Sequence, residues 1–361
     1  MPLVVANVSG RVEAFTVQQP PVFVTFGDGA IAKVPDALRA CAGTRAIVAP
    51  TPSLRSLAER VRTLLGAADA GVFDGVSPHV PGTAVDALAA LATEREADVL
   101  IALGGGAAID LCKAAALPIG ARVLAVPTTY GGAELTAHAG RTDARAKLPV
   151  ASGPPRAVVY DPELTYGLPL RASGGSAMNA LAHCVEALYA PHPQPLALLA
   201  AEEGLRRIPP ALRAVAATLG DPAARAELLY GAYLAGVALA GSGMALHHRI
   251  CHVLGGRYGL AHGDANAVVL PYAARFNESA APGALAIVAR ALDDGDDAPR
   301  AIARLARDGG TLGSLRELGL DRAELPQVAD LVLSAPLVNP RPVERDALLA
   351  LLERAWEGSV P

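Results

Sequence analysis

The stretch Ala97–Leu117, ADVLIALGGGAAIDLCKAAAL, decides which class of fold this sequence predicts. Val99–Leu103 is a continuous apolar run, which is typical of a strand buried on both faces of a sheet. Three glycines follow, and Ala107–Leu117 has the composition of a helix. A buried strand, a glycine turn and a helix in this order predict one unit of a parallel α/β sheet.

The same alternation of strands and helices extends to both sides of this stretch. Short apolar runs predict strands within residues 20–32 and at 45–49, 70–73 and 122–126. Apolar residues at helical spacing predict helices at residues 54–65 and 83–96. We therefore expect an α/β dinucleotide-binding domain whose parallel sheet carries helices on both faces.

The texture of the sequence changes after about residue 168. Long alanine- and leucine-rich segments follow at residues 176–189, 196–215 and 223–239, punctuated by glycine, proline and charged residues. They predict a second, all-helical domain. We expect the boundary at Leu168–Leu170, which gives a domain of residues 1–168 and a catalytic domain of residues 169–361.

Bulk composition excludes several classes of protein. With 361 residues, 52% hydrophobic and 18% charged, the chain is long and apolar enough for two folded domains. A net charge of −4 argues against a nucleic-acid binder, and the apolar runs are too short to cross a membrane. The N-terminus lacks the basic region of a signal peptide, and the four cysteines are widely spaced. We expect a cytoplasmic protein with free thiols.

Two glycine-containing loops predict a cofactor site. Gly104–Gly106 lies before a helix, where backbone N–H groups attract a pyrophosphate, although its spacing is not that of the G-x-G-x-x-G fingerprint. Pro127–Glu134, PTTYGGAE, follows the next strand and offers the hydroxyls of Thr128 and Thr129. Two such loops at adjacent strand ends predict a cofactor crevice. Tight turns without a ligand are the alternative interpretation.

A cluster of histidines predicts the site of chemistry. The segment Ala245–Pro271 contains His247, His248, His252 and His262, which are half of the 8 histidines. His248 and His252 are four residues apart, so they share one face of a helix. Such a cluster suggests a metal site or proton transfer, and structural histidines are the alternative.

Five motifs together resemble maleylacetate reductases, a branch of the iron-containing alcohol dehydrogenase superfamily. They are GGGAAIDLCK (104–113), PTTYGGAELT (127–136), YDPELTYGLPLR (160–171), MNALAHCVEALYAP (178–191) and ALHHRICHVLGG (245–256). The resemblance implies the dehydroquinate synthase-like fold of that superfamily, with an active site between the two domains. It also implies an NADH or NADPH cofactor, a small carboxylate-bearing substrate and a homodimer.

The resemblance also implies which residues form the site. Metal-using members hold a divalent ion with one Asp and three His, and these positions match Asn179, His183, His248 and His262. Asn179 cannot neutralise the charge of an ion, so we expect no functional metal. His252 matches a histidine near the nicotinamide, and Tyr130 is a candidate for lining that pocket. Candidate cofactor-binding residues are Gly104, Gly105, Gly106, Ala107, Asp110, Lys113, Thr128, Thr129 and Lys147.

Some positions depart from the family pattern. Ala107 stands where a serine is usual, Asn266 stands where the reductases usually have a histidine, and the segment from Arg141 to Pro155 looks shortened. Arg249 and Arg257 are the nearest cations for a substrate carboxylate, although both are more typical of surface residues.

The resemblance implies the reduction of maleylacetate to 3-oxoadipate in aromatic degradation, and His252 is the candidate general acid. Two alternatives stay open. The first is a homologue with diverted chemistry, such as a non-redox lyase in a biosynthetic pathway, and the second is a binding protein without activity.

Overall fold

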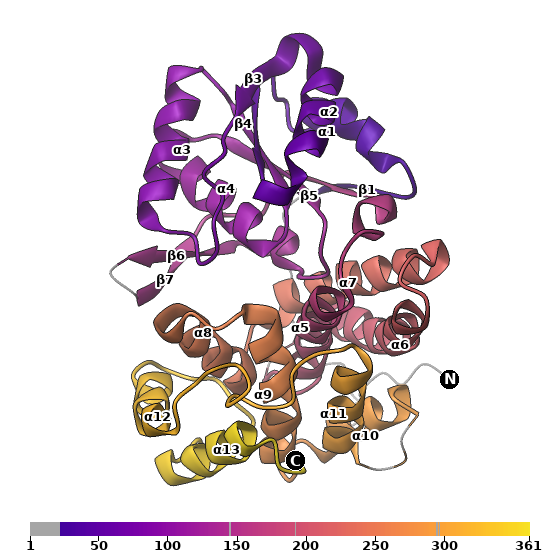
Figure 1. Ribbon diagram of the computed structural model, residues 1–361, viewed down its shortest axis with the longest axis vertical. Coiled ribbons are helices and arrows are strands. Elements are labelled where there is room, and N and C mark those ends of the chain that lie inside the picture. The colour runs from indigo at the N-terminus through magenta and orange to yellow at the C-terminus, as the bar shows by residue number, and fades with distance from the viewer. Residues whose placement is uncertain (1–21, 144–145, 192, 294, 296) are drawn as a thin grey trace.

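A six-stranded sheet forms the centre of the N-terminal half of the chain. The computed structural model describes residues 22–143, 146–191, 193–293, 295 and 297–361. The sheet has the order β1-β8-β5-β4-β2-β3, and its paired strands are parallel (Figure 1). The strands are β1 (Phe23–Phe26), β2 (Ala46–Pro50), β3 (Asp69–Val72), β4 (Val99–Gly104), β5 (Arg122–Pro127) and β8 (Ala157–Tyr160).

Four helices cover this sheet on both faces, as the sequence predicts. They are α1 (Val34–Ala40), α2 (Arg55–Leu65), α3 (Gly82–Glu94) and α4 (Gly106–Ile119). Along β4 the buried side chains alternate between two hydrophobic clusters. Ile101 packs in the cluster that contains residues of α1 and α2, whereas Leu100 packs in the cluster that contains residues of α3 and α4. This alternation is what a strand with two covered faces requires.

An antiparallel hairpin leaves the sheet domain between β5 and β8. It consists of β6 (His138–Asp143) and β7 (Ala146–Ala151). This hairpin occupies most of the segment that looks shortened in the sequence. Figure 1 shows it extending below α4, and β7 contacts α8 of the helical region.

The rest of the chain is helical, which confirms the predicted fold class. No single described helix is long and apolar enough to span a membrane. Helices α7 and α8 have that length and composition only when taken together, and they are bent by 104° relative to each other. The helices are α5 (Leu170–Leu188), α6 (Pro195–Ala217), α7 (Pro222–Ser242), α8 (Leu246–Tyr258), α9 (His262–Asn277), α10 (Pro282–Ala291), α11 (Ala298–Asp308), α12 (Leu325–Leu333) and α13 (Arg345–Glu357).

Helix α5 is the centre of the helical region, and its packing brings the histidine-bearing helices together. Almost every residue from Ser173 to Leu188 is buried, and the helix contacts α6, α7, α8 and α9. Gly175 meets Gly263 so closely that a Cβ on Gly175 would lie 3.0 Å from the carbonyl carbon of Gly263. The backbones of α5 and α9 therefore touch beside His262, the first residue of α9.

Candidate active site

Three loops meet at the carboxyl ends of β2, β4 and β5. These strands are neighbours, so Thr51, Gly104–Gly106 and Thr128–Thr129 lie at the same edge of the sheet. From β2 the chain moves outward to β3, whereas from β4 it moves the other way to β5. The crevice at such a reversal is where open α/β sheets bind ligands.

The three glycines of the first loop have different surroundings. Gly104 has a positive φ of 152°, and a Cβ there would overlap Thr51 Oγ1. A Cβ on Gly105 would lie 2.9 Å from Thr129 Oγ1, whereas a Cβ on Gly106 would meet no atom within 4 Å. Helix α4 begins at Gly106 and no side chain caps it. The loop is therefore closely packed at its start and open at the helix N-terminus, where free N–H groups are available to an anion.

The residues next to these glycines lie at the surface of the same crevice. Ala107 is partly buried at the start of α4, and Thr129 is partly buried after β5. Thr128 is buried, and its backbone N–H donates to the carbonyl of Gly104 over 3.0 Å. The two predicted loops are therefore bonded directly to each other.

Lys113 bonds to the segment that follows the second loop. Its side chain is buried in α4, and Nζ donates to the carbonyl of Ala133 and to Thr136 Oγ1, each over 3.0 Å, and to the carbonyl of His138. Asp110 lies on the same helix and accepts a backbone N–H of β6 over 3.1 Å. Both residues hold the segment after the second loop in place. A compact ammonium suits three converging acceptors better than a guanidinium does.

Lys147 and Tyr130 are two further residues that the sequence predicts for the site. The side chain of Lys147 lies outside the described part of the chain, although its backbone pairs with Thr142 in the hairpin. Tyr130 is completely buried, and Arg225 donates to its hydroxyl over 3.0 Å. Tyr130 therefore packs beneath the second loop and does not line an open pocket.

The four histidines His183, His248, His252 and His262 form a continuous row, which we call the imidazole row. The ring centroids of His183 and His248 are 4.3 Å apart, those of His248 and His252 are 6.3 Å apart, and those of His252 and His262 are 5.9 Å apart. His183 and His248 are buried, whereas His252 and His262 are partly exposed. Burial, followed by the nearby His248 and His247, holds the pKa of His183 well below its usual value.

Asn179 connects the imidazole row to the second loop. Its Nδ2 donates to the carbonyl of Gly131 over 2.9 Å, and its Oδ1 lies 3.3 Å from His248 Nε2. Gly132, the next residue of the loop, lies beside His183, since a Cβ on Gly132 would be 3.6 Å from His183 Cδ2. The predicted cofactor loops and the predicted histidines, which are far apart in sequence, therefore belong to one site.

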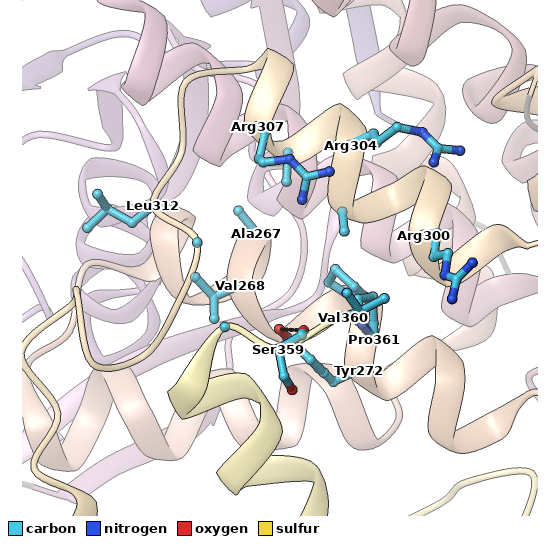
Figure 2. Close-up of a pocket in the computed structure, with 15 residues that line it drawn as sticks. Ala267, Val268, Tyr272, Arg300, Arg304, Arg307, Leu312, Ser359, Val360 and Pro361 are labelled. Carbon is cyan, nitrogen blue, oxygen red and sulfur yellow. Dashed lines mark hydrogen bonds between the residues drawn. The ribbon is translucent and has the colours of Figure 1, made fainter.

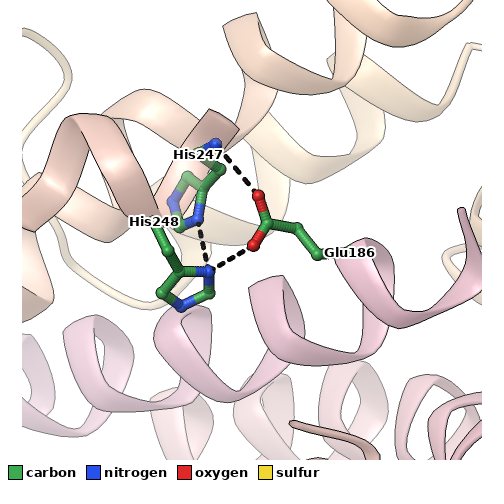
Figure 3. Close-up of side chains that lie close together, drawn as sticks. All are labelled: Glu186, His247 and His248. Carbon is green, nitrogen blue, oxygen red and sulfur yellow. Dashed lines mark hydrogen bonds and ion pairs between the residues drawn. The ribbon is translucent and has the colours of Figure 1, made fainter. Parts of the chain in front are cut away.

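Two buried residues of this site were not assigned a role from the sequence. Figure 3 shows Glu186 facing both His247 and His248. Glu186 lies on α5 seven residues after Asn179, on the same face as Asn179 and His183, so helical periodicity could have identified it. His247 is fully buried, and its Nε2 lies 3.1 Å from the carbonyl of Asn266.

Neither candidate arginine lies in the site. Arg249 donates to the carbonyls of Leu331 and Val332 at the end of α12, over 2.9 and 3.1 Å, so it caps that helix. Arg257 is exposed on the last turn of α8. Asn266 is buried in α9 and donates to the carbonyl of His262 over 2.7 Å, which fixes the first turn of that helix.

A separate pocket of about 360 Å³ lies between α9, α11 and the C-terminal residues (Figure 2). Arg300, Arg304 and Arg307 of α11 line it together with Tyr272. None of the predicted site residues contributes to its wall.

Comparisons with known proteins identify the family. The model of the iron-containing alcohol dehydrogenases matches residues 21–162, and the model of the C-terminal region of the same family matches residues 173–356. The chain belongs to the iron-containing alcohol dehydrogenase family. The family resemblance inferred from the five motifs is thereby confirmed.

Similar proteins within this family are maleylacetate reductases. The maleylacetate reductase of Burkholderia cepacia is 42% identical over 340 residues, which cover 94% of this chain and 96% of that protein. The crystal structure of maleylacetate reductase from Agrobacterium tumefaciens has a TM-score of 0.91 and 38% identity, and it covers 97% of this chain and 100% of that one. The corresponding structure from Rhizobium sp. strain MTP-10005 has a TM-score of 0.90 and 38% identity, with the same coverage.

The residues at the family's metal positions do not fit a divalent ion. Imidazole ligands direct their lone pairs at one point about 2.0–2.1 Å from each nitrogen. The rings of His183 and His248 are instead stacked, with 7° between their planes. Because Asn179 Nδ2 is bonded to Gly131, its Oδ1 faces His248 Nε2, which must then carry a hydrogen and offer no lone pair. Asn179 adds no negative charge.

One other set of side chains has ligand atoms close together. Among the described residues, the ligand atoms of Glu186, His247 and His248 lie within 4.8 Å of one another. Both carboxylate oxygens already accept backbone N–H groups. Hydrogen bonds therefore account for this cluster without an ion.

Proposed function

We propose that the protein is an NADH- or NADPH-dependent maleylacetate reductase that forms 3-oxoadipate in the degradation of aromatic compounds. One observation carries the proposal: the imidazole row is bonded, through Asn179 and Gly131, to a loop that packs on the triple glycine. A nicotinamide held by the loops would face imidazoles that can deliver a proton. The identity to maleylacetate reductases over nearly the full chain supports the choice of substrate.

The positions of the histidines in the imidazole row suggest how the proposed reduction proceeds. A bound nicotinamide would supply a hydride to the carbon–carbon double bond conjugated to the substrate ketone, and the electron pair of that bond would then reside on the ketone oxygen as an enolate. His252 is partly exposed and is the proposed proton donor, so one hydride and one proton are added in total. The low pKa of His183 keeps that ring neutral, so we assign stabilisation of the enolate to the other rings of the row, His248, His252 and His262.

We propose a place for each part of the cofactor from the two loops. The pyrophosphate would lie against Gly104–Gly106 at the N-terminus of α4, and the nicotinamide would pass Thr128 and Thr129 toward the row. Arg55 is the candidate cation for a 2′-phosphate, and it forms an ion pair with Asp74 beyond β3. Both side chains are about half exposed, so this ion pair is weak and is compatible with either NADH or NADPH.

We also propose a cytoplasmic homodimer with an α/β domain of residues 1–168 and a helical domain of residues 169–361. The gap between the two family models, residues 163–172, supports this boundary.

Strand β1 lies at an edge of the sheet, and its Phe23 and Phe26 are 42% and 40% exposed, which favours coverage by a second copy. The free cysteines, Cys41, Cys112, Cys184 and Cys251, suit a reducing compartment. Light scattering of the purified protein tests the dimer.

Loss of NADH absorbance in the presence of maleylacetate tests the proposed reaction. We expect steady NADH consumption and one 3-oxoadipate formed per NADH. His252→Ala should reduce turnover about 10²–10⁴-fold, the usual contribution of general acid catalysis, and NADH binding should persist. Conversion of substrate without NADH loss would indicate the lyase-type alternative. No conversion at all would contradict the proposal.

A further inference from the structure

Glu186 of α5 binds the first residues of α8 through hydrogen bonds. Its side chain is buried, and its two oxygens accept the backbone N–H groups of Ala245 and His247, each over 2.9 Å. His248 Nδ1 lies 2.6 Å from the same carboxylate (Figure 3). No side chain of the α8 segment caps this helix, so Glu186 supplies the cap from a neighbouring helix.

Only a carboxylate fits these partners. The two backbone groups are N–H donors that cannot be reversed, so both side-chain oxygens must accept. A glutamine would direct its NH₂ group at one of the two N–H groups. The N-terminus of α8 also favours a negative charge at this point.

His247 fixes the same edge of the His248 ring from the other side. The carbonyl of Asn266 accepts from His247 Nε2 over 3.1 Å, so the Nδ1 of neutral His247 carries a lone pair. That lone pair faces His248 Nδ1 over 3.3 Å, and the two rings are nearly perpendicular, at 88°. His248 Nδ1 therefore donates toward Glu186 and His247.

The opposite edge of the His248 ring is fixed as well. Its Nε2 faces Asn179 Oδ1, whose orientation is set by the bond from Nδ2 to Gly131. With acceptors at both nitrogens, His248 carries a hydrogen on each and is an imidazolium paired with the Glu186 carboxylate. The ring can neither flip nor rotate without losing a hydrogen bond. His252 packs against the ring so held, with 63° between the planes.

We propose that Glu186 and His247 are positioning residues for the reaction: they fix the His248 ring, which in turn orients His252 for proton transfer. This inference rests on the proposed function. Neither residue meets the substrate, and both act through His248.

Two variants and a matched control test the proposal by kinetics. Glu186→Ala should reduce kcat about 100-fold and His247→Phe about 10-fold, because small displacements of catalytic groups have effects of that size. Values of kcat are taken per NADH-binding site, so that loss of folded protein does not count, and the Kd for NADH should stay within about 2-fold. Leu38→Ala truncates a buried side chain of α1, away from the histidines, and should leave kcat per site unchanged.

The kinetic and structural results separate this inference from the proposed function. If wild-type protein does not oxidise NADH with maleylacetate, the proposed function fails, and the crystal structure of Glu186→Ala then decides the inference. In that structure the contact between His248 Nε2 and Asn179 Oδ1 should be lost. An unmoved His248 ring overturns the inference, as does an active wild type whose Glu186→Ala variant keeps its full kcat per site.

Discussion

Replacing Gly106 with alanine tests the phosphate site without disturbing the fold. A Cβ at this position meets no atom within 4 Å, and the residue does not adopt a positive φ. Gly106 begins α4, where alanine is favoured over glycine by at most about 0.5–1 kcal/mol. We therefore expect a melting temperature equal to that of the wild type or slightly higher.

The same methyl group would occupy space that the cofactor needs. A pyrophosphate at the start of α4 accepts charge-assisted hydrogen bonds from backbone N–H groups, each contributing about 1.5–3 kcal/mol. A Cβ on Gly106 keeps the phosphate away from at least one of these donors. Loss of one such bond corresponds to about a 10- to 100-fold increase in the Kd for NADH.

Fluorescence titration with NADH measures the affinity, and thermal unfolding measures the stability of the same samples. Gly283→Ala is the matched control, because Gly283 lies in the first turn of α10 and also has open space around its Cβ position. It should change neither quantity appreciably. If Gly106→Ala binds NADH as tightly as the wild type, the triple glycine is a tight turn without a ligand and the cofactor assignment is wrong.

Three other predictions concern the free energy of unfolding, which chemical denaturation measures in each case. Gly104→Ala should lower the free energy of unfolding by about 2–6 kcal/mol, because the Cβ overlaps Thr51 and the φ is unfavourable; an unchanged midpoint refutes this. Lys113→Met should cost about 3 kcal/mol by leaving buried acceptors unpaired, and a neutral effect would contradict the assigned role. Burial lowers the pKa of His247 to about 3, so the unfolded chain binds more protons below about pH 6.5, and this contribution to stability is lost as the pH falls. Relative to His247→Phe, the free energy of unfolding of the wild type should fall by about 1.4 kcal/mol per pH unit between pH 6 and pH 4. If the two proteins lose stability in parallel as the pH falls, the lowered pKa of His247 is contradicted.

The sheet domain could be predicted because its signals are local. The apolar run of β4 and the glycines after it determine a buried strand and a turn whatever the rest of the chain does. Both loops lie at strand ends, so a parallel sheet brings them to one edge. The histidines at positions 248 and 252 could likewise be placed on one face of a helix from their spacing.

Roles that depend on packing between distant segments could not be predicted in the same way. Lys113 lies close in sequence to the glycine loop, but the direction of its side chain depends on where the chain runs after β5. Arg249 lies among the histidines in sequence, but its hydrogen-bond partners are carbonyls of α12, which packs beside α8 in the tertiary fold. Glu186 shows a detectable helical spacing, yet its partners at the start of α8 come from the tertiary fold.

The crystal structure of the protein with bound NADH, combined with elemental analysis of the same crystals, would show whether the cofactor faces the imidazole row without a metal ion. We expect the pyrophosphate at Gly104–Gly106, the nicotinamide C4 facing His252, and no stoichiometric iron or zinc. A nicotinamide directed away from the imidazole row, or a metal ion bound stoichiometrically between His183, His248 and His262, would contradict this expectation.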